Sequence, residues 1–282
     1  MNTQKIVQAI LGKRPELTEK QILETFEAEK NRTGGLIADG TLLRLIAVRY
    51  GVEIPKESTS DCTLLIGHLI PSLNNVTLSG RVVAVYPTKT FEGTKPGKYA
   101  SLLIADREGL LRVMLWNGKA DLVEAGVVTV GQVVRFVRGY SREDRNGKTE
   151  LHISEKGEVE VNPEDLDKDA YPFIEQFVLP IKEIREAQQM IHLIGKVKTI
   201  FLSSTFTRHD NSVGRVLRFT IVDQTGDVVV VAWNEKAEKL EASLKNDIGI
   251  KLVNARVKVG SNDGFEVHVD EFTYVEVFDA SK

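Results

Sequence analysis

The strongest constraint on the fold of this chain is an internal repeat. Two segments carry the same landmarks in the same order, and matched positions lie 115 to 117 residues apart. The matched pairs are Gly80 and Gly195, Asp106 and Asp223, Trp116-Asn117 and Trp233-Asn234, and the Val-Glu-Val triplets at 159–161 and 275–277. A repeat of this length indicates that one folding unit occurs twice in tandem.

Each copy of the repeat alternates apolar and polar residues between glycine-containing turns, which is typical of β-strands. The expected order is three strands, a short helix at 119–124 or 235–244, and two closing strands. This is the element order of the OB-fold, a five-stranded and partly open barrel. The sequence therefore predicts a mainly β protein with two tandem OB-fold barrels.

The residues before the repeat have helical apolar spacing, beginning with Ile6, Val7 and Ile10. Thr18 and Gln21 have the spacing of a capping box, and the following Gly34-Gly35 pair predicts the end of a helix. A small all-α module is therefore expected in front of the barrels. The predicted parts are a three-helix module at 1–58, a first OB-fold at 62–162, an acidic linker and lead-in at 163–180, and a second OB-fold at 181–282.

The composition excludes several classes of protein. The 282 residues include 37 Lys and Arg against 40 Asp and Glu, so no overall basic excess points to nucleic acid. The single cysteine, Cys62, rules out a disulfide framework and a Cys-rich zinc site. No apolar run approaches the roughly 18 residues of a membrane span, and the N-terminus lacks a signal-peptide core. We expect a cytoplasmic, nucleoid-associated protein without cofactor, metal or membrane.

The most informative strand covers residues 110–116. Period two places the apolar residues at 111, 113 and 115 on one face and Arg112, Met114 and Trp116 on the other. An exposed tryptophan beside an arginine is suited to stack on a nucleic-acid base while the cation contacts phosphate. A tryptophan covered by the neighbouring helix is the alternative, and the recurrence of this residue as Trp233 favours stacking.

Aromatic and basic residues gather in the expected strand 1–2 and strand 4–5 loops, which flank the groove of an OB-fold. In a slightly acidic chain this local concentration favours a nucleic-acid groove. The predicted base-stacking residues are Trp116, Trp233, Phe265, Phe91, Phe206 and Tyr140. The predicted phosphate contacts are Lys89, Lys95, Lys98, Arg112, Arg138, Arg142, Arg145, Lys148, Arg208, Arg215, Arg218, Lys251, Arg256 and Lys258. The acidic run at 155–169 is expected to be a solvated connector outside the groove.

Several of these motifs share the pattern of a known family. They are Arg112-Val-Met-Leu-Trp116-Asn117, residues 229–240, Gly97-Lys98, Gly214-Arg215 and Asn262-Asp-Gly-Phe265. They resemble the third-strand motif, the basic end of the first groove loop and the strand 4–5 hairpin of the archaeal-type replication protein A family. The resemblance covers roughly residues 62–278. It implies tandem OB-folds that bind and protect single-stranded DNA in replication, recombination and repair.

The chain departs from this family in three places. Its first repeat has Asn146-Gly-Lys-Thr149 where the second carries Phe265, and Val229 stands where the first repeat has Arg112. A zinc-binding module, which many family members carry, is excluded by the single cysteine. Phe265 also alternates with two valines that suit a core, so the sequence leaves its groove or core position open.

Nothing in the sequence predicts an enzyme. His152 and His268 are expected to be surface strand residues rather than metal ligands, and residues 93–99 lack the spacing of a phosphate-binding loop. The predicted function is non-sequence-specific binding of single-stranded DNA. A single-stranded RNA binder and a protein-interaction scaffold are the alternatives. The N-terminal module is expected to dock replication or repair proteins, and both hetero- and homo-oligomers stay open.

Overall fold

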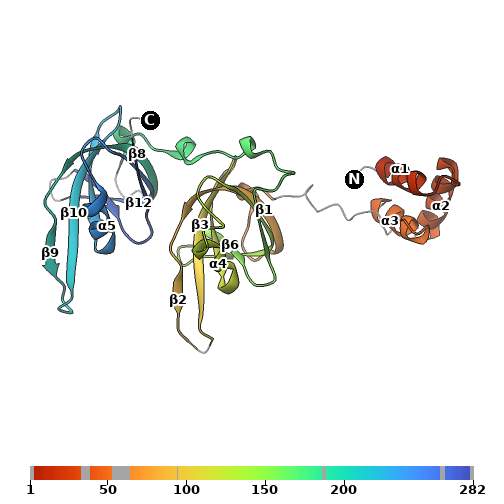
Figure 1. Ribbon diagram of the computed structural model, residues 1–282, viewed down its shortest axis with the longest axis horizontal. Coiled ribbons are helices and arrows are strands. Elements are labelled where there is room, and N and C mark those ends of the chain that lie inside the picture. Colours follow the sequence, from red (N-terminus) through yellow and green to blue (C-terminus); the bar gives the residue numbers. More distant parts are fainter. Residues whose placement is uncertain are drawn as a thin grey trace. The chain divides into compact units, whose positions relative to one another are not determined.

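The computed structural model describes residues 3–32, 39–52, 64–93, 95–185, 189–260 and 264–279. The chain divides into two compact units, Met1–Thr63 and Leu64–Lys282 (Figure 1). The expected helix end at Gly34-Gly35, the residues at 55–61 and the hairpin tip Asn262-Asp263 lie outside the described residues. No helix in the described ranges has the length and apolar character needed to cross a membrane.

The described part of the first unit consists of α1 (Thr3–Lys13), α2 (Glu19–Arg32) and α3 (Asp39–Arg49). Its core contains Ile10, Ile22 and Leu43, each with no exposed surface. The predicted capping box is present, because the Thr18 N–H donates to Gln21 Oε1 at 2.9 Å and the Gln21 N–H donates to Thr18 Oγ1 at 3.3 Å. These bonds satisfy two backbone groups that have no partner inside the helix.

The second unit begins with a β-barrel that spans most of the first repeat. Its elements are β1 (Asn74–Val85), β2 (Lys89–Phe91), β3 (Gly97–Asp106), β4 (Gly109–Trp116), α4 (Asp121–Glu124), β5 (Val133–Glu143), β6 (Thr149–Ile153) and β7 (Glu158–Val161). Strand β1 pairs antiparallel with both β3 and β5, and β4 pairs parallel with β6. Because β3 also pairs with β4 and β6 with β5, these five strands close on themselves.

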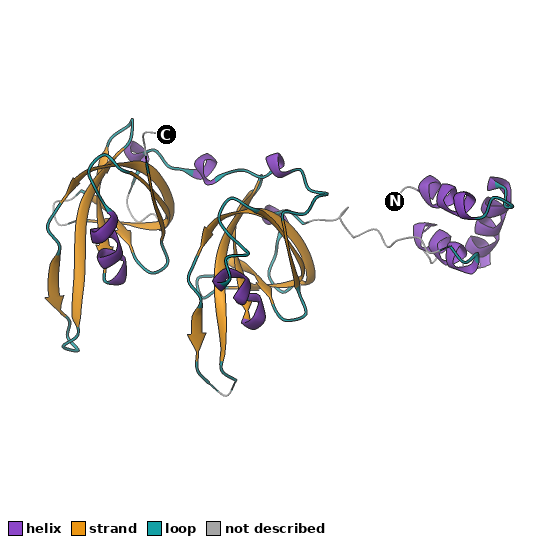
Figure 2. Cartoon of the chain, viewed as in Figure 1, coloured by secondary structure: helices purple, strands orange, loops and turns teal. Residues whose placement is uncertain are grey.

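The second barrel repeats this plan. Its elements are β8 (Gln189–Ile200), β9 (Ser204–Thr207), β10 (Val213–Val222), β11 (Asp227–Trp233), α5 (Glu235–Ser243), β12 (Gly249–Val259), β13 (Phe265–Val269) and β14 (Tyr274–Phe278). The same strands pair in the same directions, and each helix lies between the third and fourth barrel strands (Figure 2). The predicted fold class, mainly β with two tandem OB-fold barrels, is confirmed.

The landmarks of the sequence repeat have structural explanations. A Cβ on Gly195 would lie 2.8 Å from the Val222 carbonyl oxygen, and one on Gly80 would lie 3.0 Å from Ile104 Cδ1, so β8 and β1 need glycine where β10 and β3 pack against them. Asp223 accepts hydrogen bonds from the Gly226 N–H and the Ile181 N–H at 3.0 and 2.9 Å, which fixes the turn and the chain segment entering the barrel. Asp106 has the same role in the first barrel.

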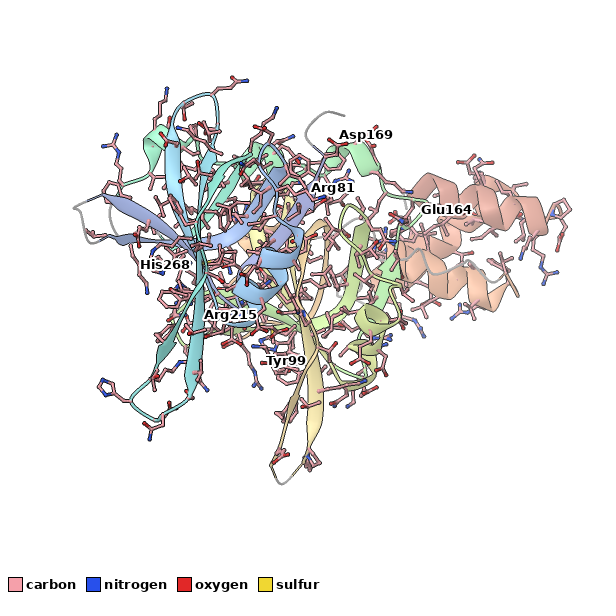
Figure 3. All side chains as sticks on the ribbon, turned by 60° about the vertical axis from the view of Figure 1, so that its left-hand side comes forward. Arg81, Tyr99, Glu164, Asp169, Arg215 and His268 are labelled. Carbon is pink, nitrogen blue, oxygen red and sulfur yellow. The ribbon has the colours of Figure 1, made fainter. Side chains whose placement is uncertain are left out.

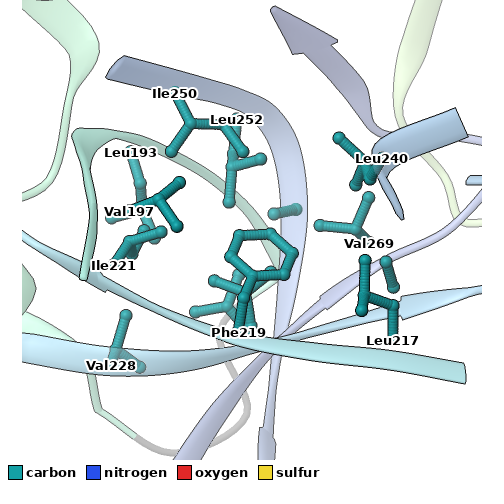
Figure 4. Packing of buried hydrophobic residues seen from close by; sticks show 14 of the residues in the cluster. Leu193, Val197, Leu217, Phe219, Ile221, Val228, Leu240, Ile250, Leu252 and Val269 are labelled. Atoms are coloured by element: carbon teal, nitrogen blue, oxygen red, sulfur yellow. The ribbon is translucent and has the colours of Figure 1, made fainter. Parts of the chain in front are cut away.

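Alternation along the strands fills both barrel interiors. Phe136 in the first barrel and Phe219 in the second have no exposed surface and are the largest side chains of their cores. Figure 4 shows Phe219 among aliphatic residues contributed by the strands and by Leu240 of α5. Burial of such side chains contributes roughly 2–3 kcal/mol each. The barrels therefore have separate cores that hold their outer faces in place.

The acidic segment at 155–169 is largely exposed to solvent, as expected, and it is also attached to the first barrel. It contains β7, and the single 3₁₀-helical turn at Lys168–Ala170 begins within its last two residues. Arg135, with a side chain 7% exposed, forms ion pairs with Glu160 at 2.8 Å and with Asp165. Arg81 donates to the Lys168, Tyr171 and Gly131 carbonyl oxygens at 2.6, 2.9 and 2.6 Å. Figure 3 labels Arg81 together with Glu164 and Asp169 of the acidic segment. Two buried arginines thus attach this solvated segment to the first barrel.

Candidate functional site

The predicted alternation along residues 110–116 is present in β4. The apolar residues at 111, 113 and 115 are buried in the barrel core, whereas Arg112, Met114 and Trp116 are half-buried on the outer face. In the second barrel, Trp233 ends β11 on the corresponding outer face and is also half-buried. Both tryptophans therefore keep part of their surface open to solvent or a ligand.

A continuous row of rings crosses the outer face of the first barrel. Trp116 lies in its centre, with Phe91 of β2 at 5.8 Å between ring centroids and Tyr99 of β3 at 5.6 Å. On its other side, His152 of β6 lies at 5.9 Å from Trp116, and Tyr140 of β5 lies 5.1 Å from His152. We call these five residues the ring row. It brings three of the predicted stacking residues together and adds Tyr99 and His152.

The second barrel has a shorter row. Phe206 of β9 lies 5.7 Å from Trp233 with their planes perpendicular, and His268 of β13 lies 5.9 Å from Trp233 on the other side. The strand register places Val216 opposite Trp233 and Arg256 opposite His268, where the first barrel has two tyrosines. The first barrel therefore offers more aromatic surface than the second.

A tryptophan–histidine hydrogen bond occurs in both barrels. The Trp116 Nε1–H donates to His152 Nδ1 at 3.0 Å, and the Trp233 Nε1–H donates to His268 Nδ1 at 3.0 Å. The two histidines are only 8% and 9% exposed, so the expectation of surface histidines is wrong, because the neighbouring strands and rings cover them. Burial and the nearby Arg142 charge lower the pKa of His152 to about 4, and burial also lowers the pKa of His268.

Cations lie beside the ring row in the first barrel. Arg112 forms an ion pair with Glu150 at 3.4 Å, and the Arg142 guanidinium lies 5.0 Å from the Tyr140 ring centroid. Arg112 and Tyr99 line one cleft of about 870 Å³ together with the exposed Arg145 and Lys148 of the β5–β6 turn.

Other predicted phosphate contacts are already held by carboxylates. Lys98 pairs with Glu124 at 2.8 Å and with Asp121 of α4, and Arg215 pairs with Glu241 of α5 at 3.3 Å. The remaining pairs are Lys89 with Glu271, Arg138 with Glu158, Lys251 with Glu175 and Glu276, and Arg256 with Asp270. The carboxylates beside Lys98 raise the pKa of its ammonium group. The sequence could not predict these pairs, because each joins residues from different elements.

The remaining four predicted phosphate contacts are Lys95, Arg208, Arg218 and Lys258. Lys95 is exposed in the β2–β3 turn, and Arg208 lies 5.5 Å from the Phe206 ring centroid while donating to Asn234 Oδ1. Arg218 on β10 and Lys258 on β12 are both exposed. Arg208, Arg218 and Lys258 belong to the second barrel, where Arg208 lies beside Phe206 and the charges of Arg218 and Lys258 act on His268.

The position of Phe265 is resolved by its exposure. It begins β13 and is 37% exposed, whereas Val267 and Val269, which follow it on alternate positions, have no exposed surface. Phe265 is therefore not a core residue and remains a candidate for stacking. Phe272 was not predicted from the sequence as a stacking residue. It is 39% exposed, and its ring centroid lies 5.1 Å from Lys89 Nζ.

Tyr99 and the two histidines were also missed as site residues. A signal for Tyr99 was present, because it directly follows the predicted loop and its alternation places it opposite Trp116. The two histidines occupy equivalent positions in the two repeats, and this recurrence could have identified them. Within the described ranges, no group of three or more His, Cys, Asp or Glu side chains is placed to hold a metal ion.

Known proteins resemble this chain in both sequence and fold. Residues 76–166 match the family described as "OB-fold nucleic acid binding domain". Replication factor A from Methanothermobacter thermautotrophicus is 27% identical over 233 residues, covering 78% of this chain and 27% of that protein. This chain thus spans about a quarter of the length of that relative.

The likeness in fold rests on a solved structure of replication protein A. A chain of a replication protein A heterotrimer bound to single-stranded DNA superposes with a TM-score of 0.56 and 16% identity, over 77% of this chain and 52% of that one. The solution structure of a replication factor A related protein from Methanobacterium thermoautotrophicum is 27% identical over 36% of this chain and 90% of its own, with a TM-score of 0.32. The chain therefore contains two tandem OB-folds, the first of which matches the nucleic-acid-binding OB-fold family, and its resemblance to the replication protein A family is confirmed.

Proposed function

We propose that this chain binds single-stranded DNA with little sequence preference and protects it during replication, recombination and repair. The observation that carries the proposal is the ring row on the outer face of the first barrel, with its shorter counterpart in the second. Aromatic stacking contributes about 1–3 kcal/mol per base and tolerates any base, because every base has a π-face. The similarity to an archaeal replication factor A supports the same function.

The proposed mechanism assigns separate roles to rings and cations. Bases stack on Trp116 and its neighbours in the row, and the phosphates contact Arg142, Arg145 and Lys148 beside it. Stacking supplies affinity without reading base edges, and the cations add attraction that weakens with salt. In the second barrel, Trp233 is the proposed stacking residue.

The ion pairs reduce the set of proposed phosphate contacts. Lys251 has a side chain only 16% exposed and two carboxylate partners, and Arg138 is held by Glu158 and by the Lys156 carbonyl oxygen at 3.0 Å. We therefore leave Lys251 out of the proposed groove, and we leave Arg138 out because both of its partners belong to the acidic segment at 155–169. Lys98 and Arg215 stay in it, because their carboxylate partners are exposed and such pairs contribute little in water.

The N-terminal unit is proposed to contact another protein rather than DNA. Leu45 and Val48 of α3 are 54% and 66% exposed, and Leu23 of α2 is 44% exposed. Apolar side chains open to solvent are more useful for protein docking than for contact with phosphates. No enzymatic activity is proposed for any part of the chain.

The proposal is tested by titrating a fluorescently labelled dT oligomer with the full chain and with Trp116→Ala and Trp233→Ala. We expect each variant to bind more weakly, by about 5- to 150-fold for the loss of one stacked base. The Trp116 change should have the larger effect because it interrupts the longer row. Unchanged affinity in both variants would refute the stacking mechanism.

A competing RNA oligomer of the same sequence tests the main alternative. Stacking alone does not distinguish the two sugars, so preference has to come from contacts to the 2′-hydroxyl position. We expect DNA to be displaced only by an excess of RNA. Displacement by less RNA than DNA would assign the site to RNA instead.

A further inference from the structure

In the tryptophan–histidine pair of the first barrel, the histidine lies at the indole edge and not over an indole face. An indole N–H points outward in the plane of its ring, so its acceptor lies beyond the ring edge. The Trp116 and His152 planes differ by 12°, their centroids are 5.9 Å apart, and the two nitrogens are 3.0 Å apart. The rings therefore lie side by side in nearly one plane, and His152 covers neither indole face.

The second barrel has the same arrangement. The Trp233 and His268 planes differ by 22°, with a centroid distance of 5.9 Å and a nitrogen–nitrogen distance of 3.0 Å. Two barrels with different neighbouring rings thus share one contact at the indole edge. If the histidine only had to shield the tryptophan from water, an in-plane hydrogen bond would not be expected in both barrels.

The far side of each imidazole faces a carboxylate. His152 Nε2 lies 3.6 Å from Glu150 Oε2, and His268 Nε2 lies 3.6 Å from Glu266 Oε2. Because Nδ1 accepts the indole hydrogen bond, the proton of the neutral ring is on Nε2, on the side of the carboxylate. Each barrel therefore holds a chain of three side chains in the order tryptophan, histidine, glutamate.

We propose that His152 and His268 are positioning residues that fix the orientation of the two indoles for base stacking. The inference rests on the proposed function, because it assigns a task to residues next to the stacking surface. A half-buried indole without this contact can turn about its side-chain bonds, and a base must then immobilise it on binding. Ordering one side chain at an interface weakens affinity by about two- to tenfold.

The protonation state of the histidines is consistent with this task. Burial is the main cause that lowers the pKa of both rings, to about 4 for His152. A neutral ring is required, because a protonated imidazole has no free acceptor. Both histidines are therefore available as acceptors at pH 7.

The first experiment observes the indole directly in the uniformly ¹⁵N-labelled full chain. The sequence contains two tryptophans, so the spectrum has two indole N–H resonances. His152→Phe keeps a ring and removes the acceptor, whereas His152→Asn places an amide oxygen near the position of Nδ1. We expect the Phe variant to shift the Trp116 resonance upfield and the Asn variant to leave it near its original position.

The second experiment measures affinity for a labelled dT oligomer by fluorescence anisotropy. His152→Phe should weaken binding by about two- to tenfold, and His152→Asn should recover most of the loss. In a Trp116→Phe background, which has no indole N–H, His152→Phe should cause no further loss. A merely structural role for the histidine would weaken binding equally in both backgrounds.

The outcomes separate this inference from the proposed function. If Trp116→Ala leaves dT affinity unchanged, the stacking mechanism itself is refuted. If Trp116→Ala weakens binding while His152→Phe shifts the resonance without changing affinity, the positioning role is overturned and stacking stands. Thermal unfolding verifies that each variant is folded, and His268→Phe provides the same test in the second barrel if the His152 variant does not fold.

Discussion

Acidification is predicted to destabilise the second barrel through its buried histidines. His192 is 6% exposed, and its Nδ1 accepts a hydrogen bond from the Asn254 N–H at 3.1 Å. Burial lowers its pKa to about 4, while the unfolded chain has the ordinary value of about 6.5. Between these two values the unfolded chain binds a proton that the folded barrel does not. The contribution of His192 to the unfolding free energy is therefore fully present above pH 6.5 and is lost as the pH decreases toward 4.

The size of the effect follows from the two pKa values. The pKa of His192 changes from about 6.5 in the unfolded chain to about 4 in the folded barrel. This difference lowers the unfolding free energy by about 2 kcal/mol between pH 7 and pH 5. His268 adds to this loss with the same sign, since its pKa is also lowered. In the first barrel, burial raises the pKa of Glu150, which opposes the effect of His152. The second barrel is therefore the cleaner test.

Urea unfolding of the Trp116→Phe chain measures this barrel alone, because Trp233 is then the remaining tryptophan. We expect the unfolding free energy to be at least about 2 kcal/mol lower at pH 5 than at pH 7. His192→Asn, which retains an acceptor and does not titrate, should reduce this difference by about 2 kcal/mol. Equal stability at the two pH values would refute the assignment of His192 as a neutral buried acceptor.

Three further predictions concern other parts of the chain. Arg81→Met should destabilise the first barrel by about 2–3 kcal/mol in urea unfolding, because it leaves backbone carbonyls without their donor, and should change dT affinity by less than twofold. Replacing Arg142, Arg145 and Lys148 together by Ala should make the log–log salt dependence of dT binding shallower by about two, at about 0.7 per phosphate, and an unchanged slope would place the DNA elsewhere. A chain that begins at Ser60 should keep its dT affinity within about tenfold, or about 1.4 kcal/mol, and a larger loss in a folded protein would assign the N-terminal unit to the DNA site.

The fold was predictable because its signals are local or periodic. The repeat identified two copies of one unit, alternation identified the faces of β4, and the spacing of Thr18 and Gln21 identified a helix start that the hydrogen bonds confirm. The tryptophans at the ends of β4 and β11 followed from the same alternation. These inferences need only the period of the chain, which is contained in the sequence.

The contacts of the site were less predictable because they depend on strand register. Lys98 and Arg215 were expected to be phosphate contacts, but each pairs with a carboxylate of the helix that follows the next strand. His152 was expected on the surface, but parallel pairing of β6 with β4 brings it to the edge of Trp116. A charge or a ring in the sequence does not reveal its partner when that partner lies on another strand.

The most direct test of base stacking in both barrels is the emission of each tryptophan during a dT titration. Trp116→Phe and Trp233→Phe leave one tryptophan each, so each variant reports on one barrel. We predict that saturating dT oligomer quenches the emission of both single-tryptophan chains. Full binding measured by anisotropy, with no change in emission from either tryptophan, would contradict stacking as the mechanism.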